Sequence, residues 1–199
     1  MSDRPDLTAL LGSRICHDLI SPIGAIGNGV ELLMMEGGST TGPEIALISE
    51  SVASANARIR FFRVAFGQSS PDQRIGRSEI LSILADLAPG SRLSIDWQIA
   101  QDMTRQDAKL GFLAFLCLET AMAYGGKVTL TSEGNRLTVI GQAARMKIVP
   151  EVWELLSSPG RGEVLTPALV HFALLGEEIT RQRRRIAVEL RETEIRMVI

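Results

Sequence analysis

Apolar residues recur every three or four positions in the first third of the chain and predict two long amphipathic helices. The first is expected over residues 6–36, up to the breaker-rich segment 37–42. The second is expected over 43–67, opened by Pro43 and closed by Gly67. The first apolar stripe comprises Ile15, Leu19, Pro22, Ile26, Val30 and Leu33, and the second comprises Ile45, Ile48, Val52, Ala55, Ile59, Phe62 and Phe66.

Two long helices joined by a short turn form an antiparallel hairpin, which cannot cover both of its apolar stripes alone. A four-helix bundle is the usual solution, so we expect residues 1–68 to form a homodimer that supplies the second pair of helices. The alternative is that the two helices pack against the C-terminal half of the same chain.

After the linker-like segment 68–73, the pattern changes to shorter elements that predict a second domain over 74–199. We expect an α+β fold in which helices cover one face of a mixed sheet, an α/β sandwich. The predicted helices are 78–87, capped by Ser78, then 105–124, 150–156 and 166–176; the predicted strands are 91–99, 127–132, 135–141, 183–190 and 194–199.

A histidine and an aspartate stand side by side on the first predicted helix. At about 100° per residue, His17 lies about 200° from both Ile15 and Leu19, so it points away from the apolar stripe. Pro22 lies inside the helix and lacks the amide hydrogen that the Asp18 carbonyl would accept, so a kink is expected there. A neutral imidazole is a nucleophile near pH 7, and an adjacent carboxylate can orient it or take its proton. A His-Asp pair alone is more often without chemistry, but the outward placement, small neighbours and the proline together favour phosphoryl transfer.

Composition narrows the setting in which such a protein works. The chain has 199 residues, 45% hydrophobic and 5% aromatic, with a net charge of −2, which indicates a globular, helix-rich protein. That charge balance favours neither nucleic acid nor an anionic membrane as a partner. Cys16 and Cys117 have no motif spacing, the N-terminal residues lack a signal-peptide core, and no apolar run is long enough to span a bilayer. We therefore expect a cytoplasmic protein.

The run from Cys16 to Ile26 reads Cys-His-Asp-Leu-Ile-Ser-Pro-Ile-Gly-Ala-Ile. Its order of histidine, acid, aliphatic residue, two variable residues and proline resembles the phosphoacceptor box of bacterial sensor histidine kinases. With Asn28-Gly29 and the segment 31–33 (Glu-Leu-Leu) behind it, the run is more specifically similar to the ChpT-type histidine phosphotransferases of alphaproteobacteria. Those two-component proteins keep a kinase-like layout, are dimeric, and pass phosphoryl groups between response regulators without binding ATP.

The order of elements after residue 74 resembles the ATP-binding domain of histidine kinases, but the nucleotide-binding residues differ. The positions of the two kinase asparagines hold Leu116 and Thr120, and neither leucine nor the alanine at the lysine position binds phosphate or metal. The segment 139–145 lacks the expected aspartate, and 158–162 has too little glycine for a phosphate-binding lid. Neither ATP nor a bound metal is expected, and the domain is interpreted as scaffold or docking surface. Glu119 is either a remnant of the kinase box or a solvated residue.

The resemblance implies that His17 accepts a phosphoryl group from the aspartyl phosphate of one receiver domain and donates it to another. Asp18 would orient or deprotonate the imidazole. The expected partners are receiver domains of response regulators, including that of a hybrid histidine kinase, and the receiver is expected to bring Mg²⁺ because the chain has no cofactor of its own. The docking surface is expected to comprise Arg14, Ile20, Ser21, Gly24, Ala25, Asn28 and Arg63.

Two other functions fit parts of the sequence. An autophosphorylating histidine kinase would need the nucleotide motifs that are missing. A non-catalytic dimeric adaptor that sequesters receivers would use the same docking surface, with His17 incidental. Arg60 and Arg63 are read either as positive charge for an acidic partner or as solvated residues. His171 is read as a packed residue, and the basic run 181–185 as a solvated turn or, less favoured, a receiver contact.

Overall fold

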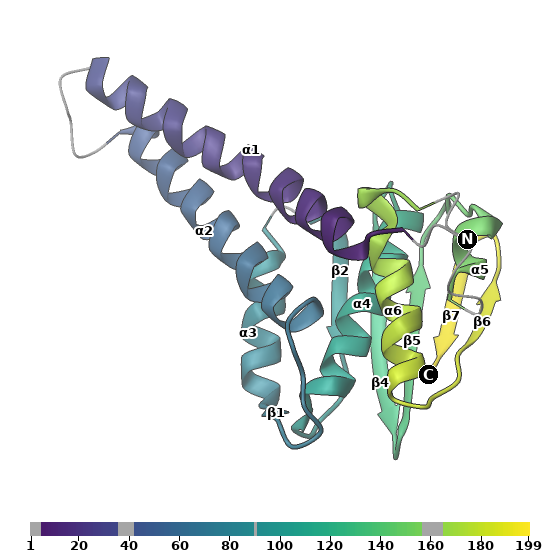
Figure 1. Cartoon of the computed structure of the whole chain (residues 1–199). Coiled ribbons are helices and arrows are strands. Elements are labelled where there is room, and N and C mark those ends of the chain that lie inside the picture. The colour runs from purple at the N-terminus through teal and green to yellow at the C-terminus, as the bar shows by residue number, and fades with distance from the viewer. Residues whose placement is uncertain (1–4, 36–41, 90, 157–164) are drawn as a thin grey trace.

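The computed structural model describes residues 5–35, 42–89, 91–156 and 165–199. Figure 1 shows a long helical hairpin that leans on a domain of helices and one main sheet. The helices are α1 (Leu7–Met35), α2 (Pro43–Ala65), α3 (Arg77–Leu87), α4 (Arg105–Ala121), α5 (Pro150–Glu154), the 3₁₀-helix η2 (Pro167–Leu169) and α6 (Val170–Arg181). The strands are β1 (Arg74–Ile75), β2 (Leu93–Trp97), β3 (Met103–Thr104), β4 (Gly126–Glu133), β5 (Arg136–Gln142), β6 (Ala187–Leu190) and β7 (Glu194–Val198).

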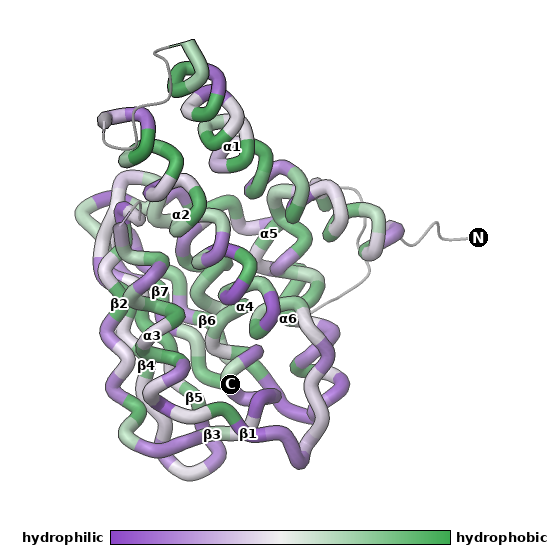
Figure 2. The backbone as a smooth tube through the Cα atoms, turned by 90° about the vertical axis from the view of Figure 1, so that its left-hand side faces the viewer, coloured by the Kyte–Doolittle hydropathy of each residue, from purple (hydrophilic) through white to green (hydrophobic). Residues whose placement is uncertain are grey.

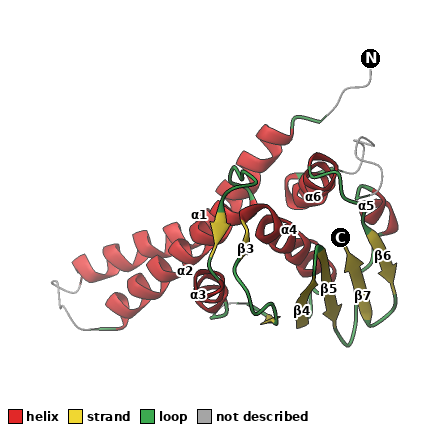
Figure 3. Ribbon diagram, turned by 90° about the horizontal axis from the view of Figure 1, so that it is seen from below, coloured by secondary structure: helices red, strands yellow, loops and turns green. Residues whose placement is uncertain are grey.

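The main sheet has the strand order β2-β4-β5-β7-β6. Strands β2 and β4 are parallel, as a connection through the long helix α4 requires, and the remaining pairs are antiparallel. Seen from below in Figure 3, α4 and α6 lie on one side of the sheet. The predicted α+β fold with helices on one face of a mixed sheet is confirmed. The small β1–β3 pair was not predicted, because strands of two residues leave no periodic signal.

The hairpin is held by a close approach of its two helices. A Cβ atom on Gly29 of α1 would lie 2.6 Å from Cγ1 of Ile48 on α2, so only glycine leaves room for the packing seen. At the other end of the hairpin, Phe61 of α2 is 1% exposed and stacks on Phe112 of α4, with 4.7 Å between the ring centroids. Packing on the C-terminal half therefore does occur, but only for the proximal half of the hairpin; the distal half extends away (Figure 1).

A cluster of charged residues binds the segment after α2, which joins the hairpin to the C-terminal domain. The carboxylate of Glu178 is 4% exposed and accepts hydrogen bonds from Arg181 and Gln182, with a second cation, Lys109, 3.4 Å away. Burial raises the pKa of Glu178, but these hydrogen bonds and charges outweigh it and lower the pKa overall. Lys109 also donates to the Gly67 carbonyl at 2.9 Å, and Arg181 to the Ser69 hydroxyl at 3.0 Å. The linker is thus pinned to both α4 and α6.

Several predicted helix ends were wrong. Gly76, not Ser78, caps α3, and Asp102 accepts a hydrogen bond from the first amide of that helix, at Arg77. Helix α4 ends at Ala121 rather than 124, ahead of two glycines with positive φ. Helix α6 does not stop at Gly176, because that glycine is buried within it and its carbonyl accepts from Thr180.

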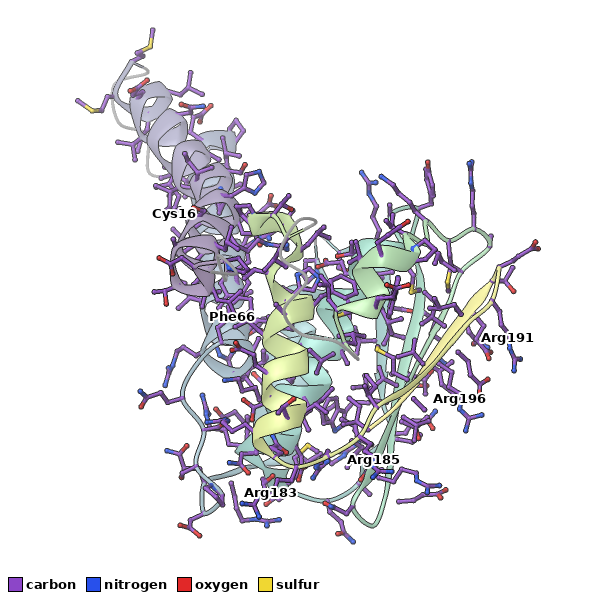
Figure 4. All side chains as sticks on the ribbon, turned by 45° about the vertical axis from the view of Figure 1, so that its right-hand side comes forward. Cys16, Phe66, Arg183, Arg185, Arg191 and Arg196 are labelled. Atoms are coloured by element: carbon purple, nitrogen blue, oxygen red, sulfur yellow. The ribbon has the colours of Figure 1, made fainter. Side chains whose placement is uncertain are left out.

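The predicted strand 183–190 was too long, since β6 begins at Ala187 and not at 183. Arg183 has a φ of 56° in the turn before β6. Arg183 and Arg185 are exposed, as the solvated interpretation of the basic run expects. Arg184 departs from it, because its side chain is 14% exposed and pairs with Asp107. Figure 4 shows Arg183 and Arg185 at the opposite end of the domain from Cys16, the neighbour of His17. The expected end of α1 at 36, and the loop 158–162, lie outside the described residues.

Candidate functional site

His17 lies on the side of α1 that faces solvent, and its side chain is 85% exposed. The predicted outward direction of this imidazole is therefore confirmed. Its Nδ1 atom is 3.1 Å from Oδ1 of Asp18. An ionised carboxylate has no hydrogen to donate, so Nδ1 carries the hydrogen in this bond and Nε2 keeps the lone pair. The free nitrogen is the one farther from the helix.

The Asp18 carboxylate is held from its other side. Oδ2 accepts from Nε of Arg14, one helical turn earlier, at 2.7 Å. The side chains of Arg14 and Asp18 are 17% and 11% exposed, whereas His17 is open. The acid is therefore shielded and paired, and the imidazole that it orients remains accessible.

Arg14 also reaches the C-terminal part of the chain. Its Nη1 donates to the carbonyl of Ala168 in η2 at 2.9 Å. Figure 1 shows the N-terminal half of α1 passing beside α6, the helix that follows η2. Both contacts of Arg14 are thus within the chain, a different environment from the docking surface in which the sequence placed it.

The other residues predicted for docking lie along the hairpin surface. Ile20 is 68% exposed, a high value for an apolar side chain. Ser21, Gly24 and Asn28 are exposed, Ala25 is partly buried, and Arg63 is exposed in the last turn of α2. Arg60, by contrast, forms an ion pair with Asp86 of α3 and a hydrogen bond with Ser82, so its charge is used within the chain.

Pro22 is buried within an unbroken α1. It lines a groove of about 730 Å³ between α1, α2 and α3, together with Ser21, Ser54, Arg58 and Leu87. The proline therefore faces inward while His17, five residues earlier, faces outward.

A cavity of about 350 Å³ lies behind the Arg14–Asp18 pair. Charged and polar residues on its wall are Arg14, Asp18, Arg58, Glu119 and Thr120, and its apolar wall includes Phe61, Phe62, Phe115 and Leu116. Burial raises the pKa of the Glu119 carboxyl, and the charges of Arg14 and Arg58 offset part of that increase. Glu119 lines this cavity and is exposed, in agreement with its interpretation as a solvated residue.

His171 and Thr120 lie next to this cavity wall. Thr120 Oγ1 donates to the Leu116 carbonyl at 3.1 Å and lies 3.0 Å from Nε2 of His171, so it accepts the hydrogen of that nitrogen. His171 is 1% exposed, in agreement with its interpretation as a packed residue. Burial, with a smaller effect from the charge of Arg14, lowers its pKa from 6.5 to about 3.

Two further properties of the described residues bear on the site. No three His, Cys, Asp or Glu side chains within them come together as metal ligands. None of the described helices is long and apolar enough to cross a membrane.

An exposed imidazole whose Nδ1 is held by a paired carboxylate can take a phosphoryl group on Nε2 and release it again. Carried on a helical hairpin beside an α+β domain, it gives this molecule the architecture of a histidine phosphotransfer protein.

Comparison with known proteins agrees with this assignment to the histidine phosphotransfer proteins. The model of the histidine phosphotransferase C-terminal domain family matches residues 77–194. Protein phosphotransferase ChpT of Brucella abortus (strain 2308) is 32% identical over 182 residues, which cover 87% of this chain and 86% of that protein. The chain belongs to the histidine phosphotransferase family.

One solved structure shares the layout of this chain. A bacterial phosphotransferase determined at 1.7 Å superposes with a TM-score of 0.78 at 28% identity, covering 97% of this chain and 95% of that one. The Acinetobacter baumannii histidine kinase AdeS matches with a TM-score of 0.45 at 10% identity, covering 92% and 95% of the two chains.

Proposed function

We propose that this protein is a phosphorelay histidine phosphotransferase in which His17 carries a phosphoryl group between the aspartates of receiver domains. The observation that carries the proposal is the state of His17: its side chain is 85% exposed, and Asp18 holds Nδ1 while Nε2 is free. The family, and the phosphotransferase relative at 32% identity, support the same reaction.

In the forward step, Nε2 of His17 attacks the phosphorus of an aspartyl phosphate on the donor receiver. A phosphorus–nitrogen bond forms, the bond between phosphorus and the aspartate oxygen breaks, and the aspartate leaves as a carboxylate. The ring gains positive charge while Nδ1 keeps its hydrogen, so the hydrogen bond to Asp18 strengthens as the reaction proceeds. The second step is the reverse, with the aspartate of another receiver as nucleophile.

The receiver contributes the rest of the chemistry in this proposal. Its acidic pocket brings the Mg²⁺ ion that neutralises charge on the phosphoryl oxygens. Catalysis on the His17 side is then mainly positioning. The exposed, mostly small residues Ser21, Gly24 and Asn28, with Ala25 beside them, let the receiver approach α1 closely, and Ile20 and Arg63 add an apolar and a positive contact. Receiver domains of response regulators and of a hybrid kinase are the partners in view.

A homodimer is part of the same proposal. Large apolar side chains stay exposed on both helices of the hairpin, and green segments recur toward its tip in Figure 2. They include Ile23 (57%), Val30 (41%), Met34 (77%), Leu47 (38%), Val52 (41%) and Ile59 (44%). A second hairpin would cover them and complete a four-helix bundle. Cys16 and Cys117 are both free thiols, in agreement with a cytoplasmic location.

The test uses a purified receiver domain carrying a labelled phosphoryl group. We expect the wild-type protein to acquire acid-labile label and to pass it to a second receiver, and His17→Asn to do neither. Because His17 is exposed, the substitution should leave the fold intact; Glu31→Gln, an exposed change on the same helix, is the matched control.

The same experiment separates the other functions. Label acquired from ATP alone would make the protein a histidine kinase. Stable binding to the receiver without label on the wild-type protein would make it an adaptor. Either result would overturn the proposal.

A further inference from the structure

Arg14 joins the phosphoacceptor to the C-terminal domain. Its Nε donates to Oδ2 of Asp18 at 2.7 Å, and its Nη1 donates to the carbonyl of Ala168 at 2.9 Å. We propose that Arg14 is a positioning residue of the reaction, through which the C-terminal domain fixes the orientation and tautomer of His17. The inference rests on the proposed function and concerns a contact made 154 positions along the chain.

The guanidinium is suited to this role because its donors form a rigid, planar fork. Two acceptors in different parts of the chain therefore fix its plane as well as its position. A lysine has the same charge but a single nitrogen without a fixed plane, so it cannot reproduce this arrangement. At 17% exposure the Arg14 side chain has few other conformations open to it.

The Asp18 carboxylate transmits the constraint to His17. One oxygen, Oδ2, is bound by Arg14, and the other, Oδ1, faces Nδ1 of His17. Asp18 is 11% exposed, so its ionised form needs the nearby cation. Without Arg14 the carboxylate loses both its partner and its fixed rotamer, and Nδ1 of the exposed imidazole loses the acceptor that selects its tautomer.

The carbonyl on the domain side is itself held in place. Ala168 lies in η2, which continues directly into α6, where His171 is fully buried. The Nε2 hydrogen of His171 is accepted by the Thr120 hydroxyl on α4, and that hydroxyl donates onward to the Leu116 carbonyl. A chain of hydrogen bonds and one short helical connection thus runs from the core helix α4 to Ala168, then through Arg14 and Asp18 to His17.

This arrangement gives the C-terminal domain a task apart from docking. The residues along the connection come from α4, α6, η2 and α1, and four of them, Arg14, Asp18, Thr120 and Ala168, line the same 350 Å³ cavity. The site is therefore incomplete without the domain, even though His17 and Asp18 both lie on the hairpin.

The test compares Arg14→Lys and Arg14→Gln with the wild-type protein in full length. We expect the rate constant for transfer from saturating phosphorylated receiver to fall by about 10- to 100-fold, the usual effect of losing a group that orients a reacting side chain. The receiver concentration for half-maximal rate should stay unchanged. In ¹⁵N spectra of the imidazole, the wild-type protein should show the Nδ1–H tautomer of His17, and both variants a mixture.

The domain side is tested with Thr120→Val, which keeps the shape but removes the hydroxyl that His171 uses. We expect a partial loss of the Nδ1–H tautomer of His17 and a several-fold slower transfer. Thr120→Ser keeps the hydroxyl and should restore both. Because the tautomer is measured in the absence of a receiver, a change in this variant cannot come from a lost receiver contact.

Three results would overturn the inference. The first is an Arg14→Gln variant that keeps the wild-type rate and tautomer. The second is a higher half-maximal receiver concentration in the Arg14 variants without a slower saturated rate, as for a docking residue. The third is a Thr120→Val variant with an unchanged His17 tautomer. Failure of the proposed function is seen separately, because the wild-type protein would then take no label from the receiver, or His17→Asn would still relay phosphoryl groups.

Discussion

The two histidines of this chain occupy opposite environments. His17 is 85% exposed and keeps a free nitrogen, whereas His171 is 1% exposed and uses Nε2 within the core. The first is available to a partner and the second fixes one helix against another. The same residue type therefore serves reaction in one place and structure in the other, and burial decides which.

His171 makes stability depend on pH. Its pKa is about 3 in the folded protein and about 6.5 when unfolded, so the unfolded chain binds more protons between these values. The contribution to stability is complete above pH 6.5 and is lost as pH falls towards 3, by up to about 1.4 kcal/mol per pH unit. Urea unfolding at a series of pH values from 7 to 4.5 measures this slope.

The matched variant for this slope is His171→Gln, whose amide can still donate to Thr120 but does not titrate. We expect its free energy of unfolding to fall less steeply over the same pH range. An equal slope in the variant and the wild-type protein would show that carboxylates alone cause the acid sensitivity.

The residues of the site were predictable to different degrees. The positions of His17 and Asp18 are local, because helical periodicity alone places His17 outward and Asp18 is its neighbour in sequence. Arg14 was recognised on the same surface but assigned to docking, since its carbonyl partner at Ala168 is remote in sequence. Pairing of this kind depends on tertiary structure and leaves no pattern along the chain.

At the scale of elements, the contact between α1 and α2 depends on one position. The Cβ of any other residue at 29 would lie 2.6 Å from Cγ1 of Ile48 and 3.4 Å from the Glu44 carbonyl. The sequence showed the apolar stripes of both helices but not that their closest approach falls on a glycine. Gly176 is a second glycine whose role the sequence did not show. The sequence predicted that it ends a helix, but it is buried within α6.

We expect Gly29→Ala to destabilise the protein by about 1 kcal/mol. Alanine gains about 0.8–1 kcal/mol of helix propensity, but displacing Ile48 costs about 1–3 kcal/mol. Gly12→Ala is the control, because nothing lies within 4 Å of its Cβ, and it should stabilise the same helix. Thermal and urea unfolding of the two variants check the difference in sign; a stabilised Gly29→Ala would mean that the two helices separate at little cost.

For the whole molecule, the sequence was sufficient for the hairpin, the change of pattern after residue 68, and the α+β domain. It did not reveal how the two parts meet. The seam of the second helix was read as one continuous bundle surface, but Phe61 and Phe62 at its end are buried against α4 and one another. A periodic apolar stripe shows that a surface will be covered, but not which element covers it.

The proposed dimer can be tested by substitutions on the exposed apolar surface of the hairpin. We expect Val30→Glu and Val52→Lys, made separately, each to weaken dimerisation by at least about tenfold, because each places a charge among apolar side chains. Both side chains are 41% exposed in the single chain, so the fold should survive. Light scattering over a range of concentrations gives the mass, and circular dichroism checks the helices. A wild-type protein that stays monomeric at micromolar concentration would rule the dimer out.

Glu178, Lys109 and Arg181 pin the linker at Gly67 and Ser69. Because the linker is fixed, the hairpin has little freedom to rotate relative to the C-terminal domain. A domain movement within the chain therefore cannot carry the phosphoryl group from one receiver to the next. Receiver domains must therefore bind and dissociate in turn. At low receiver concentration, the rate of phosphoryl transfer is then set by the rate of their association.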